Sequence, residues 1–218
     1  MEKALVSLSG GLDSATLLYW SVNRYDVSAV TFDYGSKHNL KEQTAAKELA
    51  RRANVRHTLI ELPFINGLFK SDLLRSGGSI PEGHYEDSSM RSTVVPFRNG
   101  IMLSIAIGFA ESCEAGTVLY AAHAGDHAVY PDCRPAFLRA ISEAGRAGTY
   151  LGVEIKDPFI GLHKKDIVLL GNELGVPFEI TYSCYKGGEI HCGKCGTCVE
   201  RKEAFRLAGI LDPTMYET

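Results

Sequence analysis

The chain has 218 residues, of which 45% are hydrophobic and 22% are charged, and its formal net charge is −3. These values are ordinary for a globular protein, and the length suits a domain with a sizeable core. The charge does not support a broad nucleic-acid surface, and no apolar run reaches the ~18 residues that a membrane span requires. Because no basic, apolar leader opens the sequence, we expect a cytoplasmic protein that binds neither membranes nor nucleic acid directly.

The first motif lies in residues 4–18, which read ALVSLSGGLDSATLL. A short apolar run predicts a buried strand, the turn Ser9–Ser14 interrupts it, and apolar residues resume at helical density. Glycine lets backbone N–H groups approach an oxyanion, and a helix N-terminus adds partial positive charge. We therefore predict an anion-binding loop, with Asp13 or Ser14 as the helix cap.

Two familiar phosphate loops do not fit this motif. A Walker loop needs Gly-Lys-Ser/Thr, but no lysine stands between Lys3 and Lys37, and the third glycine of the dinucleotide fingerprint is missing. Asp13 would repel a triphosphate unless Mg²⁺ bridges its carboxylate and the phosphates. On these residues alone, a solvent-facing turn remains an alternative to phosphate binding.

Strands and helices alternate along the chain, which predicts βαβ units and a parallel sheet. A loop-rich insertion over residues 63–90 interrupts the alternation, and we predict a substrate lid over Gly77–Ser89, with partial disorder as the alternative. The remaining predicted strands are Val27–Phe32, Arg56–Glu61, Thr117–Ala122 and Gly152–Lys156. The remaining predicted helices are Asn39–Asn54, Ile101–Glu111, Pro135–Gly145 and Lys164–Leu174.

Polar clusters follow the first, second and fourth predicted strands. These clusters are the glycine turn Ser9–Ser14, the segment Asp33–Gly35 and the longer loop His123–Arg134. Ligands of open α/β sheets bind outside the carboxyl ends of the strands. The three clusters are therefore predicted to converge on one pocket.

The last part of the chain holds a cysteine cluster with the spacing C-x7-C-x2-C-x2-C. Its members are Cys184, Cys192, Cys195 and Cys198. Four thiolates suit tetrahedral Zn²⁺ with no open position, which is a structural site. The alternatives are a [4Fe–4S] cluster, a redox C-x-x-C pair, and a Cys₃His site in which His191 replaces one sulfur.

Several motifs carry a resemblance to known proteins. SGGLDS resembles the pyrophosphate loop (PP-loop) of the ATP pyrophosphatase superfamily, whose members cleave ATP to AMP and pyrophosphate. Five segments together resemble the 7-cyano-7-deazaguanine synthase family over nearly the whole chain: SGGLDS, TFDYGSKH, VPFRN, HAGDHAVYPDCRPAF and SCYKGGEIHCGKCGTCVERKEAF.

The resemblance implies an α/β, Rossmann-like fold of the adenine nucleotide alpha hydrolase type. It has a five-stranded parallel sheet with helices on both faces and a small C-terminal zinc-binding segment. We expect a PP-loop ATP-binding domain over residues 1–180, which includes the insertion. Residues 181–218 are expected to form the zinc-binding segment and a C-terminal helix packed on that domain.

The resemblance also implies a reaction. A C–N bond-forming ligase of this family converts 7-carboxy-7-deazaguanine, ammonia and ATP to 7-cyano-7-deazaguanine (preQ0), in queuosine biosynthesis, through an adenylated carboxylate and an adenylated amide. It implies a homodimer with structural Zn²⁺, and Mg²⁺ bound with ATP. The alternatives are another PP-loop tRNA-modifying adenylating enzyme, or a non-enzymatic, zinc-stabilised nucleotide-binding module.

Site residues follow from the matched motifs. The expected catalytic residues are Asp13, Lys164 and Arg98. The expected substrate-binding residues are Asn99, Asp126, Asp132 and Arg134. Asp132 or Asp126 would accept the N–H and amino donors of the base, and Arg134 would pair with the substrate carboxylate; a loop-stabilising Asp–Arg pair is the alternative. The expected ATP-binding residues are Leu8, Ser9, Gly10, Gly11, Leu12, Asp13, Ser14, Ala15, Thr16, Leu17 and Leu18.

Overall fold

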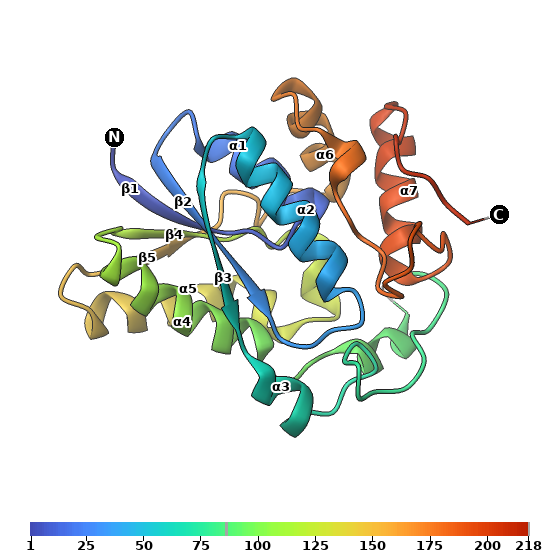
Figure 1. The fold of residues 1–218 in the computed structure, drawn as a ribbon, viewed down its shortest axis with the longest axis horizontal. Helices are drawn as coiled ribbons and strands as arrows, with labels where there is room; N and C mark the ends of the chain where they lie inside the picture. The colour runs from blue at the N-terminus through green and yellow to red at the C-terminus, as the bar shows by residue number, and fades with distance from the viewer. Residues whose placement is uncertain (86, 218) are drawn as a thin grey trace.

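The computed structural model describes residues 1–85 and 87–217; Glu86, in the predicted lid, and Thr218 lie outside the described residues. Its centre is a five-stranded sheet in the order β3-β2-β1-β4-β5, and every neighbouring pair is parallel (Figure 1). The predicted parallel α/β fold is confirmed. The strands are β1 (Lys3–Ser7), β2 (Asp26–Asp33), β3 (Arg56–Glu61), β4 (Thr117–Leu119) and β5 (Glu154–Lys156).

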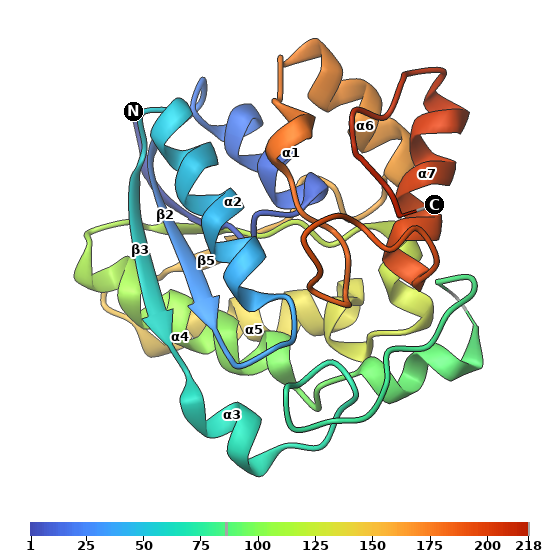
Figure 2. The ribbon, with the colours of Figure 1, turned by 45° about the vertical axis from the view of Figure 1, so that its right-hand side comes forward.

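Helices cover both faces of the sheet: α1, α2, α6 and α7 lie on one side, and α4 and α5 on the other (Figures 1 and 2). Among the described residues, no helix combines the length and apolar character needed to cross a membrane. The helices are α1 (Leu12–Ser21), α2 (Asn39–Arg52), α3 (Pro63–Leu68), α4 (Arg98–Ser112), α5 (Pro135–Gly148), α6 (Lys164–Glu173) and α7 (Gly196–Ala208).

Alternation along β1 divides the core into two layers. Ala4 and Val6 pack in the layer that contains Leu17 of α1, whereas Leu5 packs in the layer that contains Leu103 of α4. Successive side chains of a strand point to opposite faces, so a central parallel strand must be apolar on both. This explains the continuous apolar run at the start of the chain.

Several element boundaries differ from those predicted, by one to three residues. Helix α4 begins at Arg98 rather than Ile101, and β4 ends at Leu119 rather than Ala122. The N–H of Tyr120 still donates to the carbonyl of Lys156 at 3.0 Å, but the N–H of Ala122 donates to a carboxylate oxygen of Asp157 at 2.8 Å instead of to a strand. The apolar run is therefore longer than the strand.

The insertion packs onto the C-terminal segment rather than standing apart. Its short helix α3 was not predicted, and a 3₁₀ helix occupies Ser88–Thr93. Gly83 donates its N–H to the carbonyl of Lys194 at 3.1 Å, and Tyr85 is buried. The described part of the insertion thus brings an aromatic side chain into the interior.

The C-terminal segment shares the core of the sheet domain. Phe205 of α7 packs edge-on against Phe178, with ring centroids 5.2 Å apart. Arg201 is fully buried, and its guanidinium donates to Thr181 Oγ1 at 2.7 Å and to the carbonyl of Phe178 at 3.1 Å. Since a buried charge needs such partners, these bonds fix α7 against the chain that leads into the cysteine cluster.

Candidate active site

A cleft opens at the carboxyl ends of the central strands. The three predicted polar clusters all contribute to it, as Asp13, Tyr34 and Asp126 show. Side chains from α2, α4, the insertion and the C-terminal segment complete its walls, among them Glu42, Arg98, Tyr85 and Tyr185. The cleft therefore lies where an open parallel sheet places its ligands.

The glycine turn approaches α2 very closely. Gly10 has a φ of 91°, and a Cβ added there would lie 2.3 Å from the carbonyl oxygen of Glu42, so a side chain does not fit. Helix α1 begins at Leu12 with Gly11 as its N-cap, so the prediction that Asp13 or Ser14 caps the helix is wrong.

Ser14 has a different role in the turn. Its Oγ accepts the N–H groups of Ser9 and Gly10, each at 3.2 Å, from inside the first turn of the helix. The first-turn N–H groups of α1 have no carbonyl partners within the helix. The helix N-terminus at Leu12 is therefore able to receive an anion.

Asp13 follows this N-terminus and faces Lys164 of α6. Its Oδ2 lies 3.2 Å from the ammonium nitrogen, and its Oδ1 is buried with no hydrogen-bond partner among the described residues. Burial alone raises the pKa of Asp13, but the charges of Lys164 and His123 outweigh it and hold the pKa below its ordinary value. An ionised carboxylate with one free oxygen fits a Mg²⁺ ligand.

Lys164 stands at the centre of a buried polar network. Its ammonium donates to Glu200 Oε2 at 2.7 Å and lies 3.3 Å from Nε2 of His123. Burial lowers the pKa of Lys164, but Asp13 and Glu200 raise it above its ordinary value, so the ammonium is charged. Sequence reasoning missed Glu200, although its place two residues after Cys198 ties it to the cysteine cluster.

Arg98 and Asn99 begin α4 on the opposite wall. The preceding residue, Phe97, is in the left-handed conformation with a φ of 54°. Arg98 donates from Nη1 to the hydroxyl of Tyr34 at 2.9 Å, and Asn99 donates from Nδ2 to Sγ of Cys133 at 3.2 Å. Both residues line the cleft.

The expected substrate-binding residues of the long loop are engaged within the protein. Asp126 accepts the Tyr85 hydroxyl at 2.9 Å and the N–H of His123 at 3.1 Å. Asp132 is buried and accepts the N–H of Asn99 at 2.8 Å, so it anchors the start of α4.

Arg134 is exposed and lies outside the residues that line the cleft. It donates from Nε to the carbonyl of His127 at 2.9 Å. Among the ion pairs of the described residues, Arg134 pairs with neither Asp126 nor Asp132. The loop-stabilising pair considered as an alternative therefore does not form.

Sequence reasoning also missed one wall of the cleft, which is aromatic. Tyr130 and Tyr185 lie with their hydroxyls 3.1 Å apart, and the ring of His38 stacks on Tyr185 with centroids 5.2 Å apart. Tyr34 and Tyr130 lie in predicted pocket clusters and Tyr85 in the predicted lid, but no local pattern marked them as one wall, because its members come from separate segments. The cleft-lining tyrosines are Tyr34, Tyr85, Tyr120, Tyr130, Tyr182 and Tyr185.

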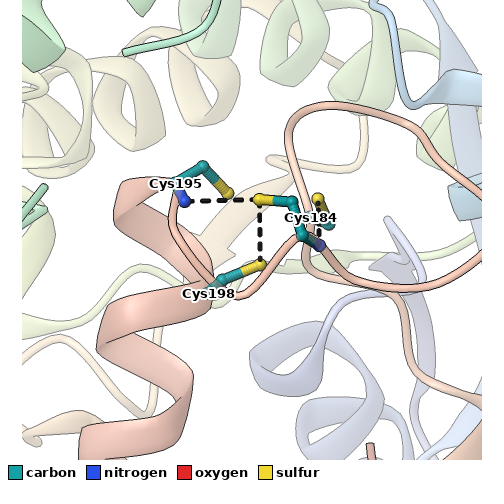
Figure 3. Close-up of side chains that lie close together, drawn as sticks. Cys184, Cys195 and Cys198 are labelled. Atoms are coloured by element: carbon teal, nitrogen blue, oxygen red, sulfur yellow. Dashed lines mark hydrogen bonds between the residues drawn. The ribbon is translucent and has the colours of Figure 1, made fainter. Parts of the chain in front are cut away.

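The four cysteines form a buried cluster at the start of α7. Their sulfur atoms all lie within 4.8 Å of one another, and Figure 3 shows Cys184, Cys195 and Cys198 pointing toward a common centre. Sγ of Cys192 lies 4.0 Å from Sγ of Cys198, close to the ~3.8 Å expected for two sulfurs of a tetrahedral zinc site. Four buried sulfurs so arranged fit a metal ion.

The Cys₃His alternative does not fit this geometry. Nε2 of His191 accepts the N–H of Ser183 at 3.0 Å, and the ring packs against Tyr182. The N–H groups of Lys194 and Cys195 point instead at a cluster sulfur, as is usual around metal-bound thiolates. The histidine therefore supports the cluster from outside.

Solved structures share this architecture. NMN synthetase from Francisella tularensis matches with a TM-score of 0.52 and 16% identity, covering 96% of this chain and 78% of that one. A predicted subunit of tRNA methyltransferase from Methanocaldococcus jannaschii matches with a TM-score of 0.51 and 15% identity, covering 79% and 75%. At such low identity these matches show the fold alone. Fold and glycine turn together define an α/β protein with a Rossmann-like parallel sheet and an anion-binding turn at the carboxyl end of its first strand.

Sequence comparisons are more specific. Residues 3–209 match the family model described as queuosine biosynthesis protein QueC. A 7-cyano-7-deazaguanine synthase of Porphyromonas gingivalis is 54% identical, over 99% of this chain and 98% of the relative. The same enzyme of Desulfotalea psychrophila is 51% identical, over 99% of both chains. This chain belongs to the QueC family, the 7-cyano-7-deazaguanine synthases of queuosine biosynthesis.

Proposed function

We propose that the protein is a ligase that converts 7-carboxy-7-deazaguanine and ammonia to 7-cyano-7-deazaguanine at the expense of ATP. The observation that carries this proposal is the meeting of the α1 N-terminus, Asp13 and Lys164 in one cleft of a QueC family member. A helix N-terminus with a neighbouring ammonium suits a leaving pyrophosphate, because both bind negative charge.

The glycine-turn end of the cleft would bind the phosphates. First-turn N–H groups at Leu12 hold the pyrophosphate oxygens, and Lys164 balances the charge that develops on them. Asp13 would hold Mg²⁺ through its free Oδ1. When bound, the metal neutralises phosphate charge between the carboxylate and the nucleotide. Arg98 lies on the far wall, where it faces the reacting acid.

The chemistry requires an activated acid. A carboxylate resists ammonia because its charge repels nucleophiles and oxide is a poor leaving group. Transfer of AMP to the carboxylate releases pyrophosphate, and ammonia then displaces AMP to give the amide. A second transfer of AMP, to the amide oxygen, releases another pyrophosphate, and loss of AMP and a proton leaves the nitrile. The protein's task is to hold the reactants in line and exclude water.

The cysteine cluster would hold a structural Zn²⁺ through four thiolates. Bound there, the ion would close the loop 184–198 and so fix the start of α7. Thiolates of this kind persist in a reducing compartment, which supports a cytoplasmic location. The homodimer and the absence of a direct nucleic-acid partner remain parts of the proposal, and light scattering with and without tRNA measures both.

One assay tests the reaction. The purified protein is mixed with 7-carboxy-7-deazaguanine, ammonium and Mg-ATP, and the products are followed by mass spectrometry. We expect AMP, pyrophosphate and the nitrile mass to accumulate together. If ATP stays intact and the acid is recovered unchanged, the synthase proposal fails and a non-enzymatic nucleotide-binding role gains support.

A further inference from the structure

One carboxyl group that lines the cleft receives no hydrogen bond from the described residues. It belongs to Glu42, on the first turn of α2, and its side chain is only 17% exposed. Nε2 of His38 lies 3.4 Å from Oε2 of Glu42. Among the described residues, no hydrogen bond to this carboxyl group forms, although both oxygens are available as acceptors.

The other carboxylates of the cleft are engaged. Among the residues described, the cleft is lined by the carboxylates of Asp13, Glu42 and Asp126. Asp13 pairs with Lys164 and belongs to the phosphate end. Asp126 uses one oxygen for the Tyr85 hydroxyl and the other for a backbone N–H. This leaves Glu42 as the carboxyl group that a ligand can engage.

The surroundings of Glu42 favour a flat ligand that donates hydrogen bonds. Burial raises the pKa of Glu42 to about 8, although the charge of Arg98 opposes this, so the carboxyl group of the free protein holds its proton at neutral pH. A ligand that donates two hydrogen bonds would stabilise the ionised form and displace this proton to solvent. Burial also lowers the pKa of His38 to about 3. The imidazole is therefore neutral and supplies no counter-charge. Tyr34 and Tyr185 line the same cleft, and aromatic rings offer flat surfaces for a heterocycle.

We propose that Glu42 recognises the donor edge of a guanine-type heterocycle, accepting its ring N–H and its 2-amino group with the two carboxylate oxygens. Such an edge presents two adjacent donors, which match one carboxylate. Adenine presents an acceptor at the corresponding ring nitrogen and would leave a carboxylate oxygen facing a lone pair. Glu42 thus becomes the residue that distinguishes the heterocycle of the acid substrate from the adenine of ATP.

The inference deepens the proposed function and rests on it for the choice of probes. The probes are 7-carboxy-7-deazaguanine and its analogue that lacks the 2-amino group, 7-carboxy-7-deazahypoxanthine. Calorimetry measures the dissociation constant of each probe for the full-length wild-type protein and for Glu42→Gln. The carboxamide of glutamine keeps the volume of the side chain. Its NH₂ group would face one of the two donors of the ligand, so the paired hydrogen bonds of the carboxylate are disrupted.

We expect the wild type to bind the 2-amino compound roughly 10- to 100-fold more tightly than its analogue. Glu42→Gln should lose most of that preference while its ATP affinity stays unchanged. Glu48→Gln is the matched control, since Glu48 lies on the same helix, where it pairs with Arg51 and Arg52 on the surface. It should behave as the wild type.

Two results overturn the inference. In the first, Glu42→Gln keeps the full preference for the 2-amino compound. In the second, the wild-type protein binds both probes equally, a result that does not depend on whether the variant folds. The turnover assay distinguishes a failure of this inference from a failure of the proposed reaction. A wild type that makes the nitrile while Glu42→Gln keeps the preference refutes the inference alone. A Glu42-dependent preference without AMP or nitrile refutes the proposed reaction and leaves the recognition role in place.

Discussion

The ammonium of Lys164 lies 2.7 Å from a carboxylate oxygen of Glu200. This bond joins α6 to α7, and Lys164 in turn lies 3.2 Å from Asp13 beside the glycine turn. Glu200 stands less than one helical turn after Cys198, so the cysteine cluster, the lysine and the phosphate end of the cleft form one connected unit. The cluster can thereby influence catalysis without touching a substrate.

Glu200→Gln tests this connection. Lys164 keeps Asp13 as a partner but loses the group that fixes it from the other side, so we expect kcat to fall about tenfold or more, with little change in the KM for ATP. Metal content, measured by mass spectrometry, should equal that of the wild type. Unchanged kcat would show that the orientation of Lys164 does not depend on Glu200. Glu203→Gln, on the exposed face of the same helix, is the control.

Asp13→Asn removes one charge from the phosphate end while keeping the volume of the side chain. Because a carboxamide is a poor Mg²⁺ ligand, we expect AMP formation to fall by about 100-fold or more. The metal bound at the cysteine cluster should be unaffected. A variant that retains wild-type turnover at saturating Mg-ATP would contradict the role assigned to this carboxylate.

Cys195→Ser tests the metal cluster. Loss of one of the four sulfurs should release the ion and lower the free energy of unfolding by more than about 3 kcal/mol, because metal binding contributes directly to folding. Metal analysis and thermal unfolding measure the two effects. Cys113→Ser, a partly buried cysteine outside the cluster, should leave both unchanged. A soluble Cys195→Ser protein that keeps its full metal content would refute the ligand assignment.

Glu42 should also leave a signature in the pH dependence of stability. Its pKa rises from 4.5 to about 8 on folding because the side chain is buried. Between these values the folded state binds more protons than the unfolded state, so the free energy of unfolding falls as the pH rises.

Glu42→Gln removes this titration. Relative to the wild type, the variant should gain about 2–4 kcal/mol of stability between pH 5 and pH 8. Chemical denaturation at several pH values measures the difference. Parallel curves for the two proteins would show that Glu42 ionises freely in the folded state.

Much of the fold was predictable because each strand has a local signature. A short apolar run buried on both faces identifies β1, and helical composition identifies α2. Local pattern is weaker where tertiary contacts end an element. The apolar run continues past β4 to Ala122, but the N–H of Ala122 donates to the carboxylate of Asp157 rather than to a neighbouring strand.

The site was harder to predict, because its missed residues have no local pattern. Glu42 looks like a solvated charge on an amphipathic helix. It faces the cleft only because Gly10 lets the glycine turn lie against the backbone of α2. Tyr85 reaches the cleft only when the insertion folds back onto the C-terminal segment. In both cases long-range packing, rather than spacing along the chain, determines the role.

The central claim is that two successive adenylations lead from the acid to the nitrile in one cleft. The most direct test is to count AMP and pyrophosphate against nitrile in a single reaction, with the amide followed by mass spectrometry. The account predicts one AMP and one pyrophosphate for each adenylation, and an amide that is converted to nitrile only when ATP is added. An amide that reaches the nitrile without ATP, or a nitrile formed with ATP left intact, would contradict it.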